Sequence, residues 1–183
     1  FAGVGVLLAI IGFPFLEDYQ KERVFTFIFP DPEARYGNTY NVIQALVSIG
    51  SGGLLGAGYG QGSQVQLRFL KVRHTDFIFS ILGQELGFVG TGVIILLFAL
   101  LVYCGIQICL KAPDLFGAYL ALGITAFIGL HAAINLGVVM GLLPTKGSTL
   151  PFISYGGTSL VINLTSMGIL LNIGSQPSMK TRL

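Results

Sequence analysis

Between residues 77 and 110 the chain reads FIFSILGQELGFVGTGVIILLFALLVYCGIQICL, with Glu85 as its one charged residue. A helix needs roughly 20 apolar residues to cross the hydrocarbon core of a bilayer, so this stretch predicts a transmembrane helix. Two further stretches, 115–142 and 152–174, meet the same requirement, and the apolar stretch 1–16 looks like a truncated span. We therefore expect about four transmembrane helices.

The composition of the whole chain indicates that lipid is its main solvent. Of the 183 residues, 53% are hydrophobic and only 10% are charged, whereas about a quarter of the residues of a soluble domain are charged. The 26 glycines agree with this, because helices in lipid pack closely through small residues. We predict an all-α polytopic membrane protein with a single membrane domain over 1–183. A net charge of +2 is too small to indicate nucleic acid as a partner.

The distribution of basic residues predicts the orientation of the helices. A long polar segment, 17–75, holds six of the ten basic residues. Lys111, Lys180 and Arg182 lie on the opposite side of the spans, so the positive-inside rule places that side and the C-terminus in the cytoplasm. The segment 17–75 is then a large extracellular loop, and Lys146 also faces outward. Six basic residues on the outer side strain the rule and indicate an anionic ligand there.

Two stretches on the outer side interrupt the helical pattern. Residues 41–55, NVIQALVSIGSGGLL, contain too few apolar residues to span and predict a re-entrant or interfacial helix. Residues 144–160, PTKGSTLPFISYGGTSL, contain prolines and glycines that predict a broken approach to the last span. Irregular backbone at membrane depth must be covered by protein or water, so we expect both stretches to converge on one cavity.

The densest polar cluster of the chain precedes the first long span and consists of Arg68, Lys71, Arg73, His74 and Asp76. In a structural interpretation, Asp76 caps a helix that starts at Phe77, and the basic residues anchor the helix end at the interface. In a chemical interpretation, the cations hold the phosphates of a lipid-linked substrate, and Asp76, kept ionised by the positive charge, acts as a general base. Both interpretations stay open at this point.

Other polar residues of the spans have structural explanations. Glu85 lies nine residues after the aspartate and so on the opposite face of the helix, which argues against a glycosidase-like pair of carboxylates. It is expected to pair with a neighbouring helix. His131 and Asn135 share one helix face, and Gly137 and Gly141 form a GxxxG pattern; interhelical hydrogen bonds and close packing explain both. The roles of Glu85 and His131 stay open.

Five blocks follow one another along the chain: QKERVFTFIFPDPEA at 20–34, GSGG at 50–53, HTDFIF at 74–79, GQELGFVG at 83–90 and PTKGSTLPFISYGGTSL at 144–160. Together they resemble, in order, the shape, elongation, division and sporulation (SEDS) family of bacterial membrane proteins. The resemblance covers nearly the whole chain. It implies a ten-helix fold whose largest outer loop lies between the seventh and eighth helices. This chain would begin in the seventh and be a C-terminal part of the fold.

The resemblance also implies a function. Members of the SEDS family are peptidoglycan glycosyltransferases of the bacterial inner membrane, which act in cell elongation, division or sporulation. They polymerise glycan strands from lipid II, with an undecaprenyl-pyrophosphate-linked strand as donor and the 4-hydroxyl of another lipid II as acceptor. Their usual partners are class B penicillin-binding proteins. The aspartate of the HTDFIF block is the family's catalytic base and corresponds to Asp76.

One departure from the family makes the expected site more basic. Residues 67–72 read LRFLKV, where family members often carry two acids and a proline. The resemblance thus implies Asp76 as the catalytic residue, with substrate contacts from Arg73, His74, Arg68, Lys71 and Lys146. No cofactor is indicated, the use of a divalent cation stays open, and so does the branch of the family.

Two other functions fit the same features. A lipid-linked precursor transporter (flippase) is one, because an outer-facing polar cavity among broken helices also describes a transport pathway. A non-catalytic membrane scaffold of the division or elongation machinery is the other, with the cations as interfacial anchors and the glycines as packing contacts.

Overall fold

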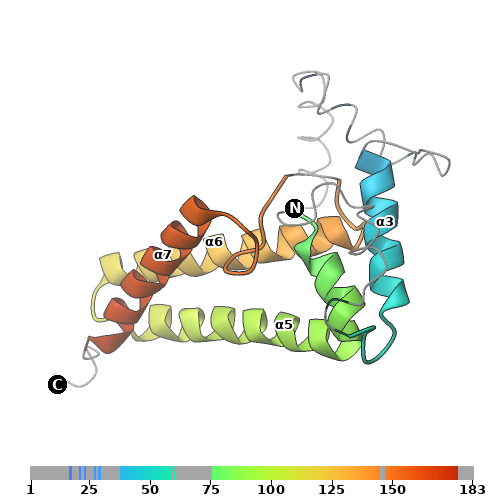
Figure 1. Ribbon diagram of the computed structural model, residues 1–183. Coiled ribbons are helices and arrows are strands. Elements are labelled where there is room, and N and C mark those ends of the chain that lie inside the picture. The colour runs from blue at the N-terminus through green and yellow to red at the C-terminus, as the bar shows by residue number, and fades with distance from the viewer. Residues whose placement is uncertain are drawn as a thin grey trace.

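A computed structural model gives the fold and describes residues 38–58, 60, 76–144 and 147–176, together with Glu17, Lys21, Arg23, Phe27 and Phe29. Four helices lie in these ranges: α3 (Asn38–Ser51), α5 (Ile78–Lys111), α6 (Leu115–Val139) and α7 (Gly157–Ser175). Figure 1 shows α5 and α6 running antiparallel and α7 crossing them toward the end of α5. In the same view α3 stands at the opposite end, beside the start of α5.

Three of the four helices, α5, α6 and α7, are long and apolar enough to cross a membrane. The helix α3 has 14 residues and is shorter than a span. This confirms the predicted all-α membrane fold. The expected span 1–16 and most of the expected loop 17–75 lie outside the described residues, and the membrane orientation of the helices stays a prediction.

Small residues bring the long helices close together. At Gly105 of α5, an added Cβ would overlap the hydroxyl of Thr125 on α6. At Gly174 of α7, an added Cβ would lie 3.1 Å from Ile108 Cγ1 on α5. Close approach at glycine is how helices gain packing energy in lipid, where apolar burial contributes little.

The long helix α5 is broken at Gly87. This residue has φ 68° and ψ −166°, so the helix consists of a first segment, 78–86, and a longer second segment, 88–111. Figure 1 shows the first segment turned steeply away from the second and running beside α3. The sequence predicted a transmembrane helix over 77–110, and α5 covers this stretch. The break at Gly87 was not predicted, because hydropathy carries no information about the φ of a glycine.

The break in α5 is filled by the turn that follows α3, residues 52–58, which we call the glycine turn. The break separates the backbone carbonyls before Gly87 from the N–H groups after it, and the glycine turn supplies new hydrogen-bond partners for both. Four backbone hydrogen bonds join the two: the N–H of Ala57 to the carbonyl of Gln84 (2.9 Å), Gly58 to Glu85 (3.2 Å), Phe88 to Gly53 (2.9 Å) and Val89 to Leu54 (3.1 Å). Two carbonyls before the break and two N–H groups after it are therefore hydrogen-bonded to the glycine turn.

The end of α6 differs from the prediction. The sequence predicted a span to residue 142 with Gly137 and Gly141 as a packing pair, but α6 ends at Val139. Gly141 has φ 70°, and the N–H of Leu142 donates to the carbonyl of Gly137 over 2.7 Å. This is the left-handed turn that commonly ends helices at a glycine, so Gly141 terminates α6. It lies against α3, where an added Cβ would be 3.6 Å from Leu46 Cδ1.

The approach to α7 is irregular, as predicted. Residues 147–156 form extended backbone and turns before α7 starts at Gly157. Phe152 has φ 66°, which is uncommon for a non-glycine residue and persists only where the surroundings hold it. Here the Ser154 hydroxyl accepts a hydrogen bond from the N–H of Leu150 over 2.7 Å.

One apolar core joins all these irregular pieces. Its buried members come from α3, the start of α5, the last turns of α6 and the approach to α7: Ala45, Phe77, Phe79, Ala132, Leu136, Val139 and Leu150. The two outer stretches that the sequence predicted to converge therefore meet through packed side chains. Asp76 directly precedes Phe77, a member of this core.

Candidate functional site

Asp76 lies immediately before α5 and is partly buried. The helix begins at Ile78, with Phe77 in the N-cap position and no side-chain hydrogen bond capping it. The interpretation of Asp76 as a helix cap is therefore wrong.

Asn135 fixes the backbone of Asp76 to the approach to α7. Its side chain is fully buried, and its amide nitrogen Nδ2 donates to the backbone carbonyl of Asp76 over 3.1 Å. The same nitrogen donates to the backbone carbonyl of Ser148. One amide thus satisfies two acceptors, and it holds together segments that lie 59 and 13 residues away in the chain.

The side chain of Asp76 also faces this approach. A Cβ placed on Gly147 would lie 3.4 Å from Asp76 Oδ2, so the carboxylate lies against the bare backbone of Gly147. The hydroxyl of Ser148 and the Oδ1 atom of Asn135 are buried and make no hydrogen bond. Orphaned buried polar atoms of this kind are uncommon, and a catalytic role is one of their explanations. The carboxylate, the glycine backbone and these two polar atoms define the candidate site.

The sequence identified one member of this site and missed another. Asp76 was expected as the catalytic residue; it lies in the candidate site, and its catalytic role stays a prediction. The five expected substrate contacts, Arg68, Lys71, Arg73, His74 and Lys146, lie outside the described residues. Asn135 was noted only as an interhelical hydrogen-bonding residue, and the intramembrane position of its amide was the one signal that could have marked it.

A hollow of about 270 Å³ lies near this site, between α6 and α7. It is lined by Phe127, His131, Thr149, Ser159, Ile162 and Asn163. Asn163 donates from Nδ2 to the hydroxyl of Ser159 over 3.3 Å, and that hydroxyl lies 3.4 Å from the hydroxyl of Thr149. The His131 ring packs against Phe127 with 5.3 Å between centroids. The lining of this hollow therefore consists of neutral hydroxyl and amide groups, aromatic and aliphatic side chains, and one imidazole.

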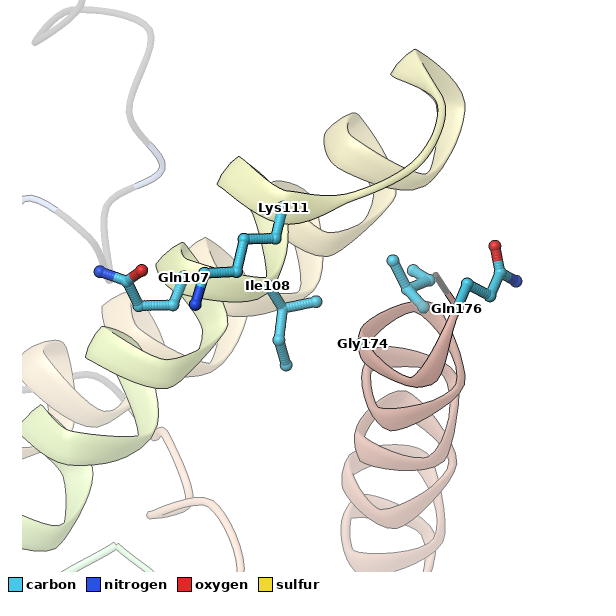
Figure 2. A pocket seen from close by; sticks show the side chains of 6 residues that line it. Gln107, Ile108, Lys111, Gly174 and Gln176 are labelled. Atoms are coloured by element: carbon cyan, nitrogen blue, oxygen red, sulfur yellow. The ribbon is translucent and has the colours of Figure 1, made fainter. Parts of the chain in front are cut away.

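A second hollow, of about 330 Å³, lies at the far end of α5. Figure 2 shows it between the last turns of α5 and α7, with Lys111 and Gln107 on one wall and Gly174 and Gln176 on the other. The whole second segment of α5 separates it from Asp76. It takes no part in the candidate site.

Glu85 has its hydrogen-bond partner outside the candidate site. Its Oε1 accepts a hydrogen bond from the N–H of Gly60 over 3.1 Å, so its partner is the backbone just after the glycine turn and not a neighbouring helix. Within the described ranges, no three His, Cys, Asp or Glu side chains gather to hold a metal ion.

The fold and the site together describe a helical membrane protein with one carboxylate, that of Asp76, just before the start of the broken helix α5. The family model described as "Cell cycle protein", which takes its name from FtsW, RodA and SpoVE, matches residues 1–179. The chain belongs to this family, the SEDS proteins.

Curated relatives agree with this membership. The chain is 44% identical to a probable peptidoglycan glycosyltransferase FtsW from Geobacter metallireducens, over 92% of this chain and 46% of the relative. It is 44% identical to stage V sporulation protein E from Bacillus subtilis, over 94% and 47%. It is 38% identical to the peptidoglycan glycosyltransferase MrdB from Escherichia coli K12, over 98% and 48%. The chain therefore spans about half the length of these relatives.

Two solved structures share the fold. One, described as "Structural coordination of polymerization and crosslinking by a peptidoglycan synthase complex", matches with a TM-score of 0.70 and 31% identity, over 94% of this chain and 46% of that chain. The other, a mutant of the rod shape determining protein RodA from Thermus thermophilus, matches with a TM-score of 0.55 and 28% identity, over 92% and 56%.

Proposed function

We propose that the intact protein is a peptidoglycan glycosyltransferase that polymerises glycan strands from lipid II, with Asp76 as its general base. The observation that carries the proposal is the fixation of Asp76 by Asn135 against Gly147, in a chain whose relatives are named peptidoglycan glycosyltransferases. An aspartate whose backbone carbonyl is tied to a buried amide, and whose carboxylate lies against the bare backbone of Gly147, is positioned for chemistry.

The proposed step needs only one carboxylate. Asp76 takes the proton from the 4-hydroxyl of the acceptor lipid II as that oxygen forms a bond to the anomeric carbon of the donor strand. The bond between that carbon and the phosphate oxygen breaks, and its electron pair leaves with undecaprenyl pyrophosphate. A positioned base of this kind contributes about 100-fold to 10,000-fold in rate. The Asp76 carboxylate is pre-oriented because its backbone is tied to α6.

The leaving pyrophosphate needs cations, and the proposal places them on Arg68, Lys71, Arg73, His74 and Lys146. Two features of the chain support this. His74 and Arg73 closely precede Asp76 in sequence, and Lys146 precedes Gly147, whose backbone lies against the carboxylate. Guanidinium and ammonium groups bind phosphate oxygens through charge-assisted hydrogen bonds.

We also propose a partner and a location. A class B penicillin-binding protein is the proposed partner, because a structure with the same fold is described as a peptidoglycan synthase complex that coordinates polymerization and crosslinking. The proposed location is the bacterial inner membrane with the C-terminus in the cytoplasm. The support is Lys111, which ends α5 on the side away from Asp76, where the positive-inside rule expects basic residues.

A polymerisation assay with two aspartate variants tests the function. The intact protein is supplied with labelled lipid II, and the strands formed by Asp76→Asn and Asp114→Asn are compared. Asp114 is a matched control, because it caps the N-terminus of α6, at the opposite end of that helix from Asn135, by accepting a hydrogen bond from the N–H of Gly117. Asparagine caps helices equally well. We expect Asp114→Asn to form strands at the wild-type rate and Asp76→Asn to form them at least about 100-fold more slowly. Strand synthesis by both variants at the wild-type rate would contradict the proposal.

A further inference from the structure

The glycine turn and the break in α5 form a joint in which each backbone group that loses its helical partner gains a new one in the turn. In an unbroken helix, the carbonyls of residues 84 and 85 would accept from the N–H groups of residues 88 and 89. The break at Gly87 separates these four groups. Each of them is instead paired with the glycine turn, over 2.9 to 3.2 Å. The turn therefore replaces two helical hydrogen bonds with four and stabilises the bend.

The joint accepts only glycine at its closest contacts. A Cβ on Gly56 would overlap the carbonyl of Glu85, and a Cβ on Gly87 would overlap the backbone nitrogen of Gly56. Both residues also have positive φ, 82° and 68°. A Cβ on Gly52 would overlap the carbonyl of Gly83. These are contacts between backbones, so neither side can yield by rotating a side chain.

The joint determines where the first segment of α5 points. That segment, 78–86, begins two residues after Asp76 and ends at the break. The segment also packs against α3, where a Cβ on Gly83 would lie 3.0 Å from Ile49 Cγ1. A change in the angle at Gly87 would move the start of the segment and the aspartate before it, while Asn135 stays with α6.

We propose that the glycine turn is a positioning element for the reaction, and that Gly52, Gly56 and Gly87 are positioning residues for Asp76. This inference rests on the proposed function of Asp76. Main-chain hydrogen bonds link the turn at the end of α3 to the first segment of α5, which begins two residues after Asp76, so what displaces the turn displaces the base. Misplacing a reacting group by about 1 Å can cost about 100-fold in rate.

A pair of glycines two residues apart gives a matched test in the intact protein. Gly52→Ala introduces the overlap with Gly83, whereas Gly50 has nothing within 4 Å of an added Cβ. We expect Gly52→Ala to lower kcat for strand synthesis by about 100-fold, with KM for lipid II nearly unchanged and the pH dependence of kcat shifted. Gly50→Ala should match the wild type in all three. A partly unfolded sample would lose amplitude without a shift in the pH profile.

Hydrogen exchange shows whether the joint has opened. The amides of residues 57, 58, 88 and 89 should exchange faster in Gly52→Ala, and those in the second segment of α5 should not. Faster exchange at the joint together with wild-type kcat would overturn the inference. If Gly52→Ala does not fold, Gly83→Ala replaces it, because the atom nearest to a Cβ on Gly83 belongs to the side chain of Ile49. Faster exchange at the joint with wild-type kcat in Gly83→Ala would also overturn the inference. Activity in Asp76→Asn would overturn the proposed function instead.

Discussion

The amide of Asn135 offers the sharpest structural perturbation of the candidate site. In Asn135→Leu the side chain keeps nearly its size, but Nδ2 is lost, and the backbone carbonyls of Asp76 and Ser148 lose their donor. Position 135 is fully buried, so water does not readily replace the amide. The expected result is that the approach to α7 separates from the start of α5.

The size of the effect follows from the two carbonyls. A buried acceptor left without a donor costs about 1 to 3 kcal/mol, so two acceptors at the lower limit cost about 2 kcal/mol. A free-energy change of about 1.4 kcal/mol changes an equilibrium constant tenfold. A cost of about 2 kcal/mol therefore shifts the local opening equilibrium by roughly 30-fold. The chemical step should fall by about 100-fold, because Asp76 loses its fixed position relative to Gly147.

Two assays measure this prediction on the intact protein. Hydrogen exchange at the amides of Ile153 and Ser154, which both donate to the carbonyl of Leu150, reports on the approach to α7. Lipid II polymerisation reports on Asp76. A matched control is Thr125→Val, because Thr125 is also buried in α6 but its hydroxyl bonds only to the carbonyl of Ala121 within the helix.

The reasoning predicts faster exchange and slow polymerisation for Asn135→Leu, and wild-type behaviour for Thr125→Val. Wild-type exchange at Ile153 and Ser154 in Asn135→Leu would refute the claim that the amide holds the two segments together. Faster exchange with an unchanged polymerisation rate would refute the claim that this tie positions the base.

Two further predictions concern the long helices. Gly105→Ala should destabilise the intact protein by about 1 to 3 kcal/mol in detergent denaturation, because its Cβ would overlap Thr125, whereas Gly92→Ala, with open space, should be neutral or stabilising by up to about 1 kcal/mol; equal effects of the two would contradict the packing described. Glu85→Gln keeps an oxygen to accept from Gly60, so polymerisation should stay within about fivefold of the wild type, the equivalent of about 1 kcal/mol. A 100-fold loss there would place Glu85 in the chemistry.

Much of the fold could be predicted from the sequence, because the cost of exposing backbone polar groups to lipid leaves few alternatives to helices. Hydropathy located α5, α6 and α7, and the prolines and glycines of residues 144–160 indicated the irregular approach to α7. The break at Gly87 was missed for a physical reason. Glycines are common in membrane helices, and this one bends the chain only because the glycine turn, about thirty residues earlier, supplies hydrogen bonds.

The candidate site was predictable in part. Asp76 could be found because an acid among cations next to an apolar span is unusual, and the resemblance implied its role. Local spacing favoured a helix cap over a base, whereas in the structure Phe77 and not Asp76 holds the N-cap position. The role of Asn135 depends on contacts with residues 59 and 13 positions away, which no local pattern contains.

The most direct test of Asp76 as a base is a single-turnover measurement on Asp76→Asn, with lipid II binding measured on the same sample. Asparagine keeps the size of the side chain and leaves the backbone tie to Asn135 in place. We predict that lipid II binds as in the wild type while glycosidic bond formation slows by at least about 100-fold. Bond formation at the wild-type rate in Asp76→Asn would contradict the assignment of Asp76 as the general base.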